Sequence, residues 1–320
     1  MKDIKHFNAT SVSDAATKLA EPGAAPIAGG TDLLTVMRAM CDPGSPDTIV
    51  NLKTIPDLDY IREEGGALKI GALTTLATIA ASSVVQTKYT ALAQAARKVG
   101  SPELRNMGTI AGNICRETRC WYFRVEHNKF SCLKKNQQGV CPAQAGDNRY
   151  QSIFGATNGC FSVNDSDVAP ALVALGATVV TNKKRIAIGD FFDVKVAPAK
   201  SAMTVLAQDE IVTEIEVPAP PSGAKSAFVK FALRKAVDTP IVNCAAVIGG
   251  GTVSICLNAV AGKPRKATAA EQAMAGKDIN DANATAAATA ALQGAASIGK
   301  NSYKIQIAKA MVKRAILACK

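Results

Sequence analysis

Residues 101–170 read SPELRNMGTIAGNICRETRCWYFRVEHNKFSCLKKNQQGVCPAQAGDNRYQSIFGATNGCFSVNDSDVAP, and the rest of the chain is organised around this stretch. A glycine-bearing turn, GTIAGN, lies near its start, and an aspartate-centred segment, SDVAP, ends it. A polar loop of this length is uncommon in a compact domain and is usually functional or disordered. Of the nine cysteines in the chain, five fall here: Cys115, Cys120, Cys132, Cys141 and Cys160. Thiolates at the start, middle and end of the loop favour function, because an inorganic centre bound by several of them would hold it in place.

The spacing of the cysteines favours some inorganic centres over others. From Cys120 to Cys160 the pattern is C-x11-C-x8-C-x18-C. Structural zinc sites usually contain C-x2-C pairs, and this chain has none. Widely dispersed cysteines suit a [4Fe–4S] cluster, because each iron corner takes one thiolate from a different direction. A zinc site, a disulfide pair and unrelated buried thiols remain alternatives at this point.

Composition limits the function classes. The 320 residues are 48% hydrophobic, which is enough for two or three domains with real cores. The net charge is +11, but the basic residues are dispersed and are not interleaved with aromatic residues, so no nucleic-acid partner is expected. The charge suits one basic face for an acidic partner or a phosphate-bearing cofactor.

The sequence also limits where the protein is located and how it could catalyse a reaction. No apolar run approaches the roughly 20 residues of a membrane helix, and the amino terminus has no signal-peptide core. We therefore expect no membrane span and a cytoplasmic protein, exported only if a partner subunit carries the signal. The two histidines, His6 and His127, are not placed like members of a catalytic triad, and no hydrolase or Walker motif occurs. We assign no catalytic residue, and a bound cofactor is expected to supply any chemistry.

Two glycine turns are the candidates for binding that cofactor. The first, Gly29-Gly30-Thr31-Asp32, lies between an expected strand and an expected helix, and the second is RNMGTIAGN at 105–113. Such turns let backbone N–H groups converge on an anion. The first turn alone is more typical of an ordinary tight turn, and it is not the G-x-G-x-x-G of a Rossmann unit. Together, the two turns can clamp a diphosphate from two sides.

The remainder of the chain predicts an α+β protein. Strands and helices alternate up to the Pro/Gly-rich segment PAPPSG at 218–223, which we take as the domain boundary. Beyond it we expect three successive antiparallel strands and then helices over 266–276, 281–297 and 302–318.

In this order, PIAGGTDLL, RNMGTIAGNI, SDVAPALVALGA, DEIVTEIEVP and FVKFALRKAVDTPIVNCA resemble the FAD-binding medium subunit of the molybdenum hydroxylase (xanthine dehydrogenase) family. The resemblance covers essentially the whole chain. It implies a two-part FAD-binding domain of the PCMH (vanillyl-alcohol-oxidase-like) type at 1–218, with a [4Fe–4S] loop at 115–165. A C-terminal domain of the CO-dehydrogenase-flavoprotein type, an antiparallel sheet with helices, follows at 219–320.

The resemblance also implies which residues contact FAD. These are Pro26, Ile27, Ala28, Gly29, Gly30, Thr31, Asp32, Leu33, Arg105, Asn106, Thr109, Gly112, Asn113, Asp167, Ile211 and Lys230.

Most members of that family lack the long cysteine loop. The loop is similar to that of a subgroup with an extra [4Fe–4S] cluster, which includes 4-hydroxybenzoyl-CoA reductase and molybdenum aldehyde oxidoreductases. This similarity implies that Cys120, Cys132, Cys141 and Cys160 bind the cluster and that Cys115 does not. Trp121, Tyr122 and Phe123 either shield the cluster from water or simply pack the loop.

The function implied is electron transfer within a complex. A large subunit with the molybdenum cofactor and a small subunit with [2Fe–2S] clusters are the expected partners, in a dimer of heterotrimers, with a soluble carrier such as ferredoxin outside it. The substrate stays open between 4-hydroxybenzoyl-CoA reduction and oxidation of aldehydes or N-heterocycles. The alternative is a zinc-stabilised binding module without redox activity. A nucleic-acid-binding protein and a self-sufficient flavin oxidase are further rivals, the latter disfavoured because no substrate-facing base is evident.

Overall fold

The computed structural model describes residues 3–39, 46–126, 129–135, 139–196 and 202–320. His127 lies outside the described residues. The mixture of helices and sheets confirms the expected α+β class, with a C-terminal antiparallel sheet.

The amino-terminal part forms a small parallel sheet. Its strands, in the order β1-β3-β2, are β1 (Lys5–Asn8), β3 (Thr48–Asn51) and β2 (Ala24–Ile27). Helix α1 (Val12–Leu19) begins after Ser11, whose side-chain oxygen accepts a hydrogen bond from the Asp14 backbone N–H at 3.1 Å. Helix α2 (Leu33–Arg38) follows the first glycine turn, as the sequence predicts.

A larger antiparallel sheet forms the middle of the molecule. Its strands, in spatial order, are β4 (Ile61–Glu64), β5 (Ala67–Gly71), β10 (Val212–Pro218), β6 (Thr178–Thr181) and β7 (Arg185–Ala187). Helices pack beside this sheet around the largest apolar core: α3 (Leu76–Ala81), α4 (Ser83–Lys88), α5 (Thr90–Arg97), α6 (Pro102–Met107), α7 (Ile110–Ile114), α9 (Val168–Ala174) and α10 (Ile188–Phe191). The apolar segment TLATIAASSVV forms two helices, α3 and α4, because Ser82 between them adopts an extended backbone conformation.

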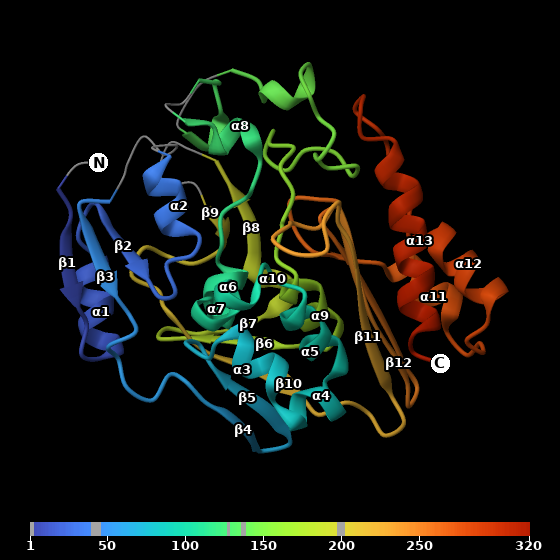
Figure 1. Ribbon diagram of the computed structural model, residues 1–320. Helices are drawn as coiled ribbons and strands as arrows, with labels where there is room; N and C mark the ends of the chain where they lie inside the picture. Colours follow the sequence, from blue (N-terminus) through green and yellow to red (C-terminus); the bar gives the residue numbers. More distant parts are fainter. Residues whose placement is uncertain (1–2, 40–45, 127–128, 136–138, 197–201) are drawn as a thin grey trace.

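The carboxyl-terminal sheet lies between two layers of helices (Figure 1). Its strands are β11 (Lys225–Phe231), β12 (Val242–Gly249), β13 (Thr252–Asn258) and β14 (Arg265–Lys266). Its outer helices are α11 (Thr268–Met274), α12 (Asp281–Ala290) and α13 (Tyr303–Leu317). Along β12, Cys244 and Ala246 pack toward these helices, whereas Ala245 and Val247 pack into the central core. Burial on both faces explains why this strand is almost continuously apolar.

The cysteine loop crosses the end of the molecule shown at the top of Figure 1. Its regular segments are short: α8 (Trp121–Arg124) and the 3₁₀ turns η2 (Leu133–Lys135) and η3 (Pro142–Gln144). A two-stranded sheet, β8 (Phe192–Lys195) and β9 (Ala202–Thr204), lies beneath the loop. The loop is fixed to the carboxyl-terminal part by hydrogen bonds, including Ile153 N–H to the Val260 carbonyl at 2.9 Å.

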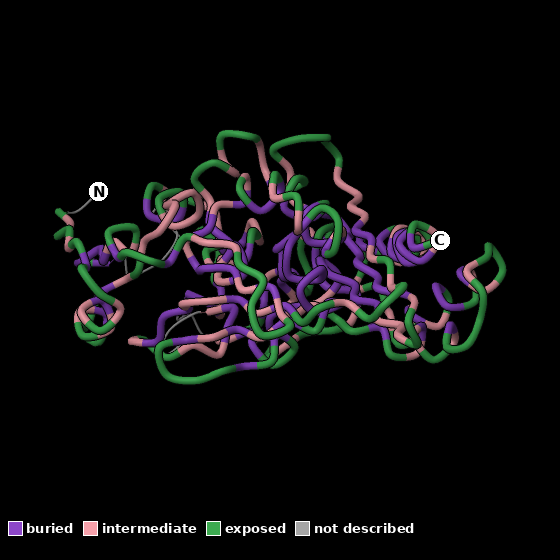
Figure 2. Tube along the Cα trace, turned by 90° about the horizontal axis from the view of Figure 1, so that it is seen from below, coloured by how far each residue is buried: buried purple, intermediate pink, exposed green. Residues whose placement is uncertain are grey.

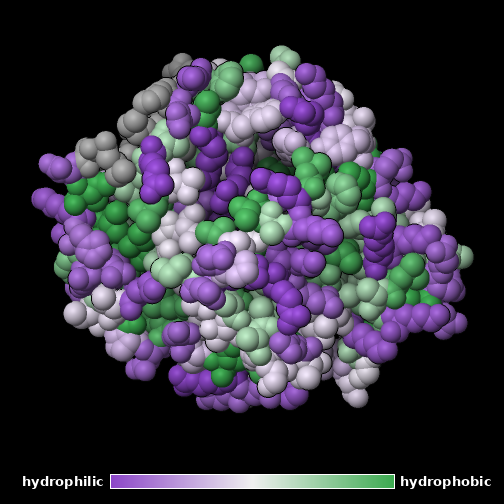
Figure 3. Space-filling model, in the orientation of Figure 1, coloured by the Kyte–Doolittle hydropathy of each residue, from purple (hydrophilic) through white to green (hydrophobic). Residues whose placement is uncertain are grey.

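The division at 218 stays a prediction, because the central core contains residues from both sides of that boundary. Figure 2 shows buried segments running through the interior and exposed segments along the outer loops. On the face seen in Figure 3, hydrophilic and hydrophobic residues are interspersed. Within the described ranges, no helix is long and apolar enough to cross a membrane.

Candidate functional site

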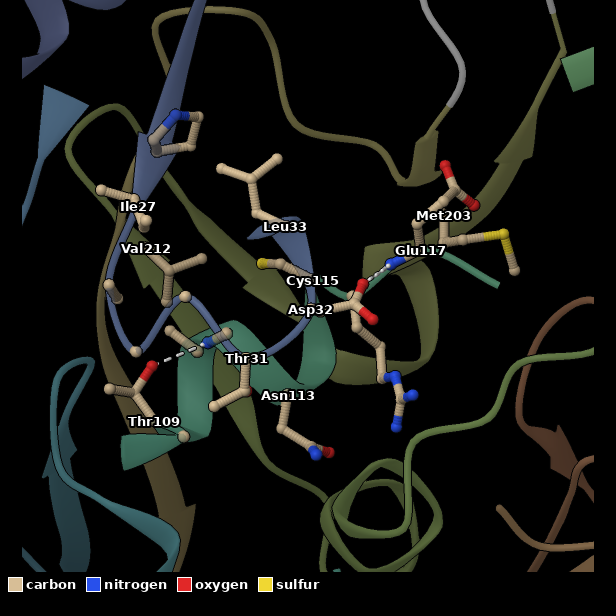
Figure 4. A pocket seen from close by; sticks show the side chains of 18 of the residues that line it. Ile27, Thr31, Asp32, Leu33, Thr109, Asn113, Cys115, Glu117, Met203 and Val212 are labelled. Carbon is tan, nitrogen blue, oxygen red and sulfur yellow. Dashed lines mark hydrogen bonds between the residues drawn. The ribbon is translucent and has the colours of Figure 1, made fainter. Parts of the chain in front are cut away.

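A cavity of about 450 Å³ opens where the two glycine turns meet strand β10 (Figure 4). Its lining includes residues 25–33 from the first turn and Thr109, Gly112 and Asn113 from the second. Ligand pockets in proteins commonly have volumes of about 300–1,000 Å³. The cavity is therefore of a size that suits a ligand, and it lies where the two turns meet.

Glycine is required where the two turns touch. A Cβ atom at Gly29 would lie 2.0 Å from the backbone oxygen of Met107, so any larger residue forces the turns apart. Gly30 has a φ of +70°, in the left-handed region that glycine adopts without strain. The first turn is thus packed against the backbone that leads into the second.

The second turn is more helical than the sequence predicts. Ser101 and Thr109 cap two short helices, α6 and α7, and Gly108 joins them. The Thr109 Oγ1 accepts a hydrogen bond from the Gly112 N–H at 3.1 Å, and Asn113 Oδ1 accepts one from Ser166 Oγ at 2.6 Å. These contacts fix the residues that face the cavity (Figure 4).

Asp167 lines the cavity at the start of α9 and is almost fully buried. Its carboxylate accepts hydrogen bonds from Lys230 Nζ at 2.7 Å and from Asn243 Nδ2 at 2.8 Å. Burial raises the pKa of Asp167, and the Lys230 cation acts in the opposite direction. Lys230 is not among the residues that line the cavity; it contacts Asp167, which is.

The remaining predicted contacts divide into two groups. Ile211 and all predicted residues of the first turn line the cavity. Arg105 and Asn106 are outside the lining: the Arg105 guanidinium donates to the Val99 carbonyl at 2.9 Å, and Asn106 is exposed. Several lining residues were not identified as cavity residues from the sequence, because they lie in short elements or loops without a binding motif. Among them are Arg116, Phe123, Met203, Gln208 and Val237.

The four predicted cluster cysteines influence one another's ionisation. Burial raises the pKa of the Cys120 thiol to about 12, and the nearby Cys160 contributes to the rise. Burial also raises the pKa of Cys132, with contributions from Cys160 and Cys141. The pKa of Cys160 is raised by burial and by Cys141. Cys160 thus lies within electrostatic range of Cys120, Cys132 and Cys141.

The described residues contain no group of three or more His, Cys, Asp or Glu side chains placed to hold a metal ion. The eight described cysteines are free thiols. A structural zinc ion requires its ligands to converge at about 2.0–2.3 Å from one point. The thiols are therefore near one another without forming such a convergent set.

Cys115 differs from the other four cysteines of the loop. It lines the cavity and packs against the central core. Burial raises its pKa to about 12, with no contribution from another described thiol. The structure separates it from the Cys120–Cys160 group.

Two family models match the chain. "FAD binding domain in molybdopterin dehydrogenase" matches residues 2–220, and "CO dehydrogenase flavoprotein C-terminal domain" matches residues 227–319. The aldehyde oxidoreductase FAD-binding subunit PaoB of Escherichia coli (strain K12) is 30% identical over 90% of this chain and 89% of its own length. The carbon monoxide dehydrogenase medium chain of Hydrogenophaga pseudoflava is 29% identical over 96% of this chain and 94% of its own.

The fold agrees with these sequence matches. A solved structure of carbon monoxide dehydrogenase from Hydrogenophaga pseudoflava superposes with a TM-score of 0.76 at 27% identity, covering 99% of this chain and 97% of the matched chain. Because one family model spans most of the chain and the fold agrees along its whole length, this protein belongs to the FAD-binding medium subunits of the molybdopterin dehydrogenase family, which are subunits of oxidoreductases.

Proposed function

We propose that this chain is the electron-transfer subunit of a heteromeric molybdenum hydroxylase-family oxidoreductase, with FAD in the cavity and one [4Fe–4S] cluster on Cys120, Cys132, Cys141 and Cys160. The observation that carries the proposal is the packing of these cysteines in one loop beside the cavity: Cys120 and Cys141 belong to one apolar cluster, and Cys160 raises the pKa of both Cys120 and Cys132. Cys160 packs against Met203, which also lines the cavity.

The cavity suits an anionic dinucleotide. Its glycine turns present backbone to the ligand, which is how proteins commonly bind phosphates. Arg116 lines the cavity, and its buried Nε and Nη2 atoms have no hydrogen-bond partner. A diphosphate or a flavin carbonyl would supply acceptors for these donors.

The cysteine loop suits a cluster with a net negative charge. Lys134 and Lys135, which follow Cys132 closely, are both buried. Lys134 opposes the rise in the pKa of Cys160, and Lys135 opposes that of Cys132. Hydrogen bonds to the ligand sulfurs, such as Gln151 Nε2 to Cys120 Sγ at 3.3 Å, also favour thiolates.

When bound, FAD exchanges electrons between two-electron and one-electron carriers, and iron–sulfur clusters carry single electrons. The residues of this chain hold, orient and shield these groups. The proposed partners are a large subunit with the molybdenum cofactor, a small subunit with [2Fe–2S] clusters and a soluble carrier such as ferredoxin. The relatives named aldehyde oxidoreductase and carbon monoxide dehydrogenase support an oxidative reaction, and 4-hydroxybenzoyl-CoA reduction stays open.

Metal analysis of the anaerobically purified chain tests the proposal. We expect about four irons and about four labile sulfides per chain, the content of one cubane cluster. We also expect visible absorbance that bleaches on reduction in addition to the flavin bands. Zinc in place of iron would instead support the zinc-stabilised binding module.

A further inference from the structure

Asp32 belongs to the first glycine turn, yet its carboxylate is bonded to the cysteine loop. Both oxygens accept hydrogen bonds from Arg124 Nη2 at 3.0 Å. The backbone N–H of Glu117 donates to Asp32 Oδ2 at 3.2 Å, a contact drawn in Figure 4. A residue that lines the cavity is thus hydrogen-bonded to two residues of the cysteine loop.

Arg124 in turn fixes the beginning of the loop. Its Nε donates to the Thr118 carbonyl at 2.7 Å and its Nη2 to the Glu117 carbonyl at 2.9 Å. Its backbone N–H donates to the Cys120 carbonyl at 2.9 Å. The side chain of Arg124 is only 13% exposed and that of Asp32 21%, so solvent screens this ion pair weakly.

The same network continues to the next cysteine. Glu117 Oε1 lies 3.1 Å from Lys134 Nζ, and Lys134 follows Cys132 by two residues. Lys134 Nζ also donates to the carbonyls of Lys195 at 3.2 Å and Ala202 at 3.1 Å. Two of the proposed cluster ligands, Cys120 and Cys132, are therefore followed within four residues by charged residues of one network that ends at Asp32.

Arg124 itself does not line the flavin cavity, whereas Asp32 does. An effect of Arg124 on flavin affinity must therefore pass through a neighbour. Asp32 is the neighbour with the closest charged contact. Removing Arg124 leaves Asp32 with only the longer ion pair to Arg119, at 3.7 Å, and without the two hydrogen bonds at 3.0 Å. The turn and the loop are therefore expected to lose order together.

We propose that the Asp32–Arg124 pair is a coupling element through which FAD binding and the cluster loop stabilise each other. The inference rests on the proposed function, because it takes the loop to hold a cluster. Cluster binding fixes Cys120, Arg124 then holds Asp32, and the first glycine turn is kept in its binding conformation. By linkage, FAD must strengthen cluster retention by the same factor. Asp32 and Arg124 are positioning residues in this scheme.

The experiment measures the dissociation constant of FAD for flavin-free protein in two forms, cluster-loaded and iron-free, by flavin fluorescence. For the wild-type chain we expect FAD to bind at least about fivefold more weakly to the iron-free form, the lower end of usual coupling factors. In Arg124→Gln the two forms should bind FAD equally, at the weaker affinity. Arg185→Gln, which removes an exposed ion pair with Glu216, should retain the wild-type difference.

A double-mutant cycle tests the route. If Arg124 acts through Asp32, Asp32→Asn combined with Arg124→Gln should bind FAD no more weakly than the worse single variant. Equal FAD affinity of the two wild-type forms, or a difference that persists in Arg124→Gln, would overturn the coupling.

Iron and labile sulfide are measured on the same samples, so that a failure of the cluster proposal can be distinguished from a failure of the coupling proposal. Failure of the wild-type chain to take up iron would contradict the cluster, not the link between the turn and the loop. In that case unchanged FAD affinity in Arg124→Gln would overturn the link, and weakened affinity with an unaffected Arg185→Gln would support it.

Discussion

Gly29 is a residue on which the shape of the cavity directly depends. A Cβ atom there collides with the Met107 carbonyl, so a side chain must separate the two glycine turns. We expect Gly29→Val to weaken FAD binding by at least about tenfold, equivalent to about 1.4 kcal/mol of binding free energy. Flavin content after gel filtration and fluorescence titration measure the effect. Gly189→Val is a matched control, because a Cβ at Gly189 meets nothing within 4 Å; full flavin occupancy in Gly29→Val would contradict the assignment.

Lys304 is a second residue whose environment makes a prediction. It is almost fully buried, and its Nζ donates to the carbonyls of Tyr150 at 3.0 Å, Gln151 at 3.0 Å and Ala259 at 2.7 Å. Lys304→Met leaves these acceptors unpaired, and we expect it to destabilise the fold by about 1–3 kcal/mol. Denaturant unfolding measures this loss.

The pH dependence of that loss follows from the protonation of Lys304. Burial lowers its pKa to about 7, whereas a lysine in the unfolded chain titrates near about 10.4. Above pH 7 the unfolded state therefore binds more protons, so this lysine makes the free energy of unfolding rise with pH. The difference between wild type and Lys304→Met should increase from about pH 7 to about pH 8.5, where unfolded cysteines begin to titrate. A difference that stays constant over this window would show that the lysine keeps its ordinary pKa.

At the scale of single elements, strands were predictable where apolar runs are bounded by turn segments. The three long carboxyl-terminal strands form the antiparallel order expected. The helix expected over 281–297 instead ends at Ala290, before Gly294 with its φ of +78°. Alanine content predicted helix propensity, but it did not show that the segment after Ala290 pairs with other parts of the fold, as when Ala296 N–H donates to the Ile153 carbonyl at 2.8 Å.

The cysteine loop is the element on which the cluster proposal is tested. Cys132→Ser and Cys141→Ser should each lose about four irons per chain, because an incomplete cysteine set does not retain the cubane. Flavin should stay bound in both variants, with affinity lowered only by the coupling through Arg124, since the glycine turns are unchanged. Cys115→Ser should keep its iron, because this thiol lies apart from the other four. Iron and sulfide analysis of these variants and of Cys160→Ser measures the outcomes. If Cys115→Ser lost its iron and Cys160→Ser retained it, the proposed ligand set would be wrong.

At the scale of the whole molecule, the site could be predicted only in part. The two glycine turns and the aspartate at 167 have local sequence patterns, and the structure brings them to one cavity. Arg116, Met203 and Gln208 reach that cavity through long-range packing of segments with no pattern of their own. The role of Asp32 was equally invisible, because its partner, Arg124, lies 92 residues away in the sequence.

The whole chain should have no turnover on an organic substrate when it is purified alone. Each carboxylate that lines the cavity in the described part of the chain has a partner: Asp32 pairs with Arg124, Glu117 with Lys134, Asp167 with Lys230, Glu210 with Lys184 and Asp238 with Arg234. Each of these carboxylates would have to give up an ion pair in order to take a proton from a substrate, which makes it a poor general base. Substrate oxidation or reduction should therefore require the molybdenum and [2Fe–2S] subunits. Assays of the chain alone and after co-expression with those subunits, with aldehydes, N-heterocycles and 4-hydroxybenzoyl-CoA, measure this requirement. Turnover by the single chain on any of these substrates would make it a self-sufficient flavin enzyme and remove the basis for an electron-transfer role.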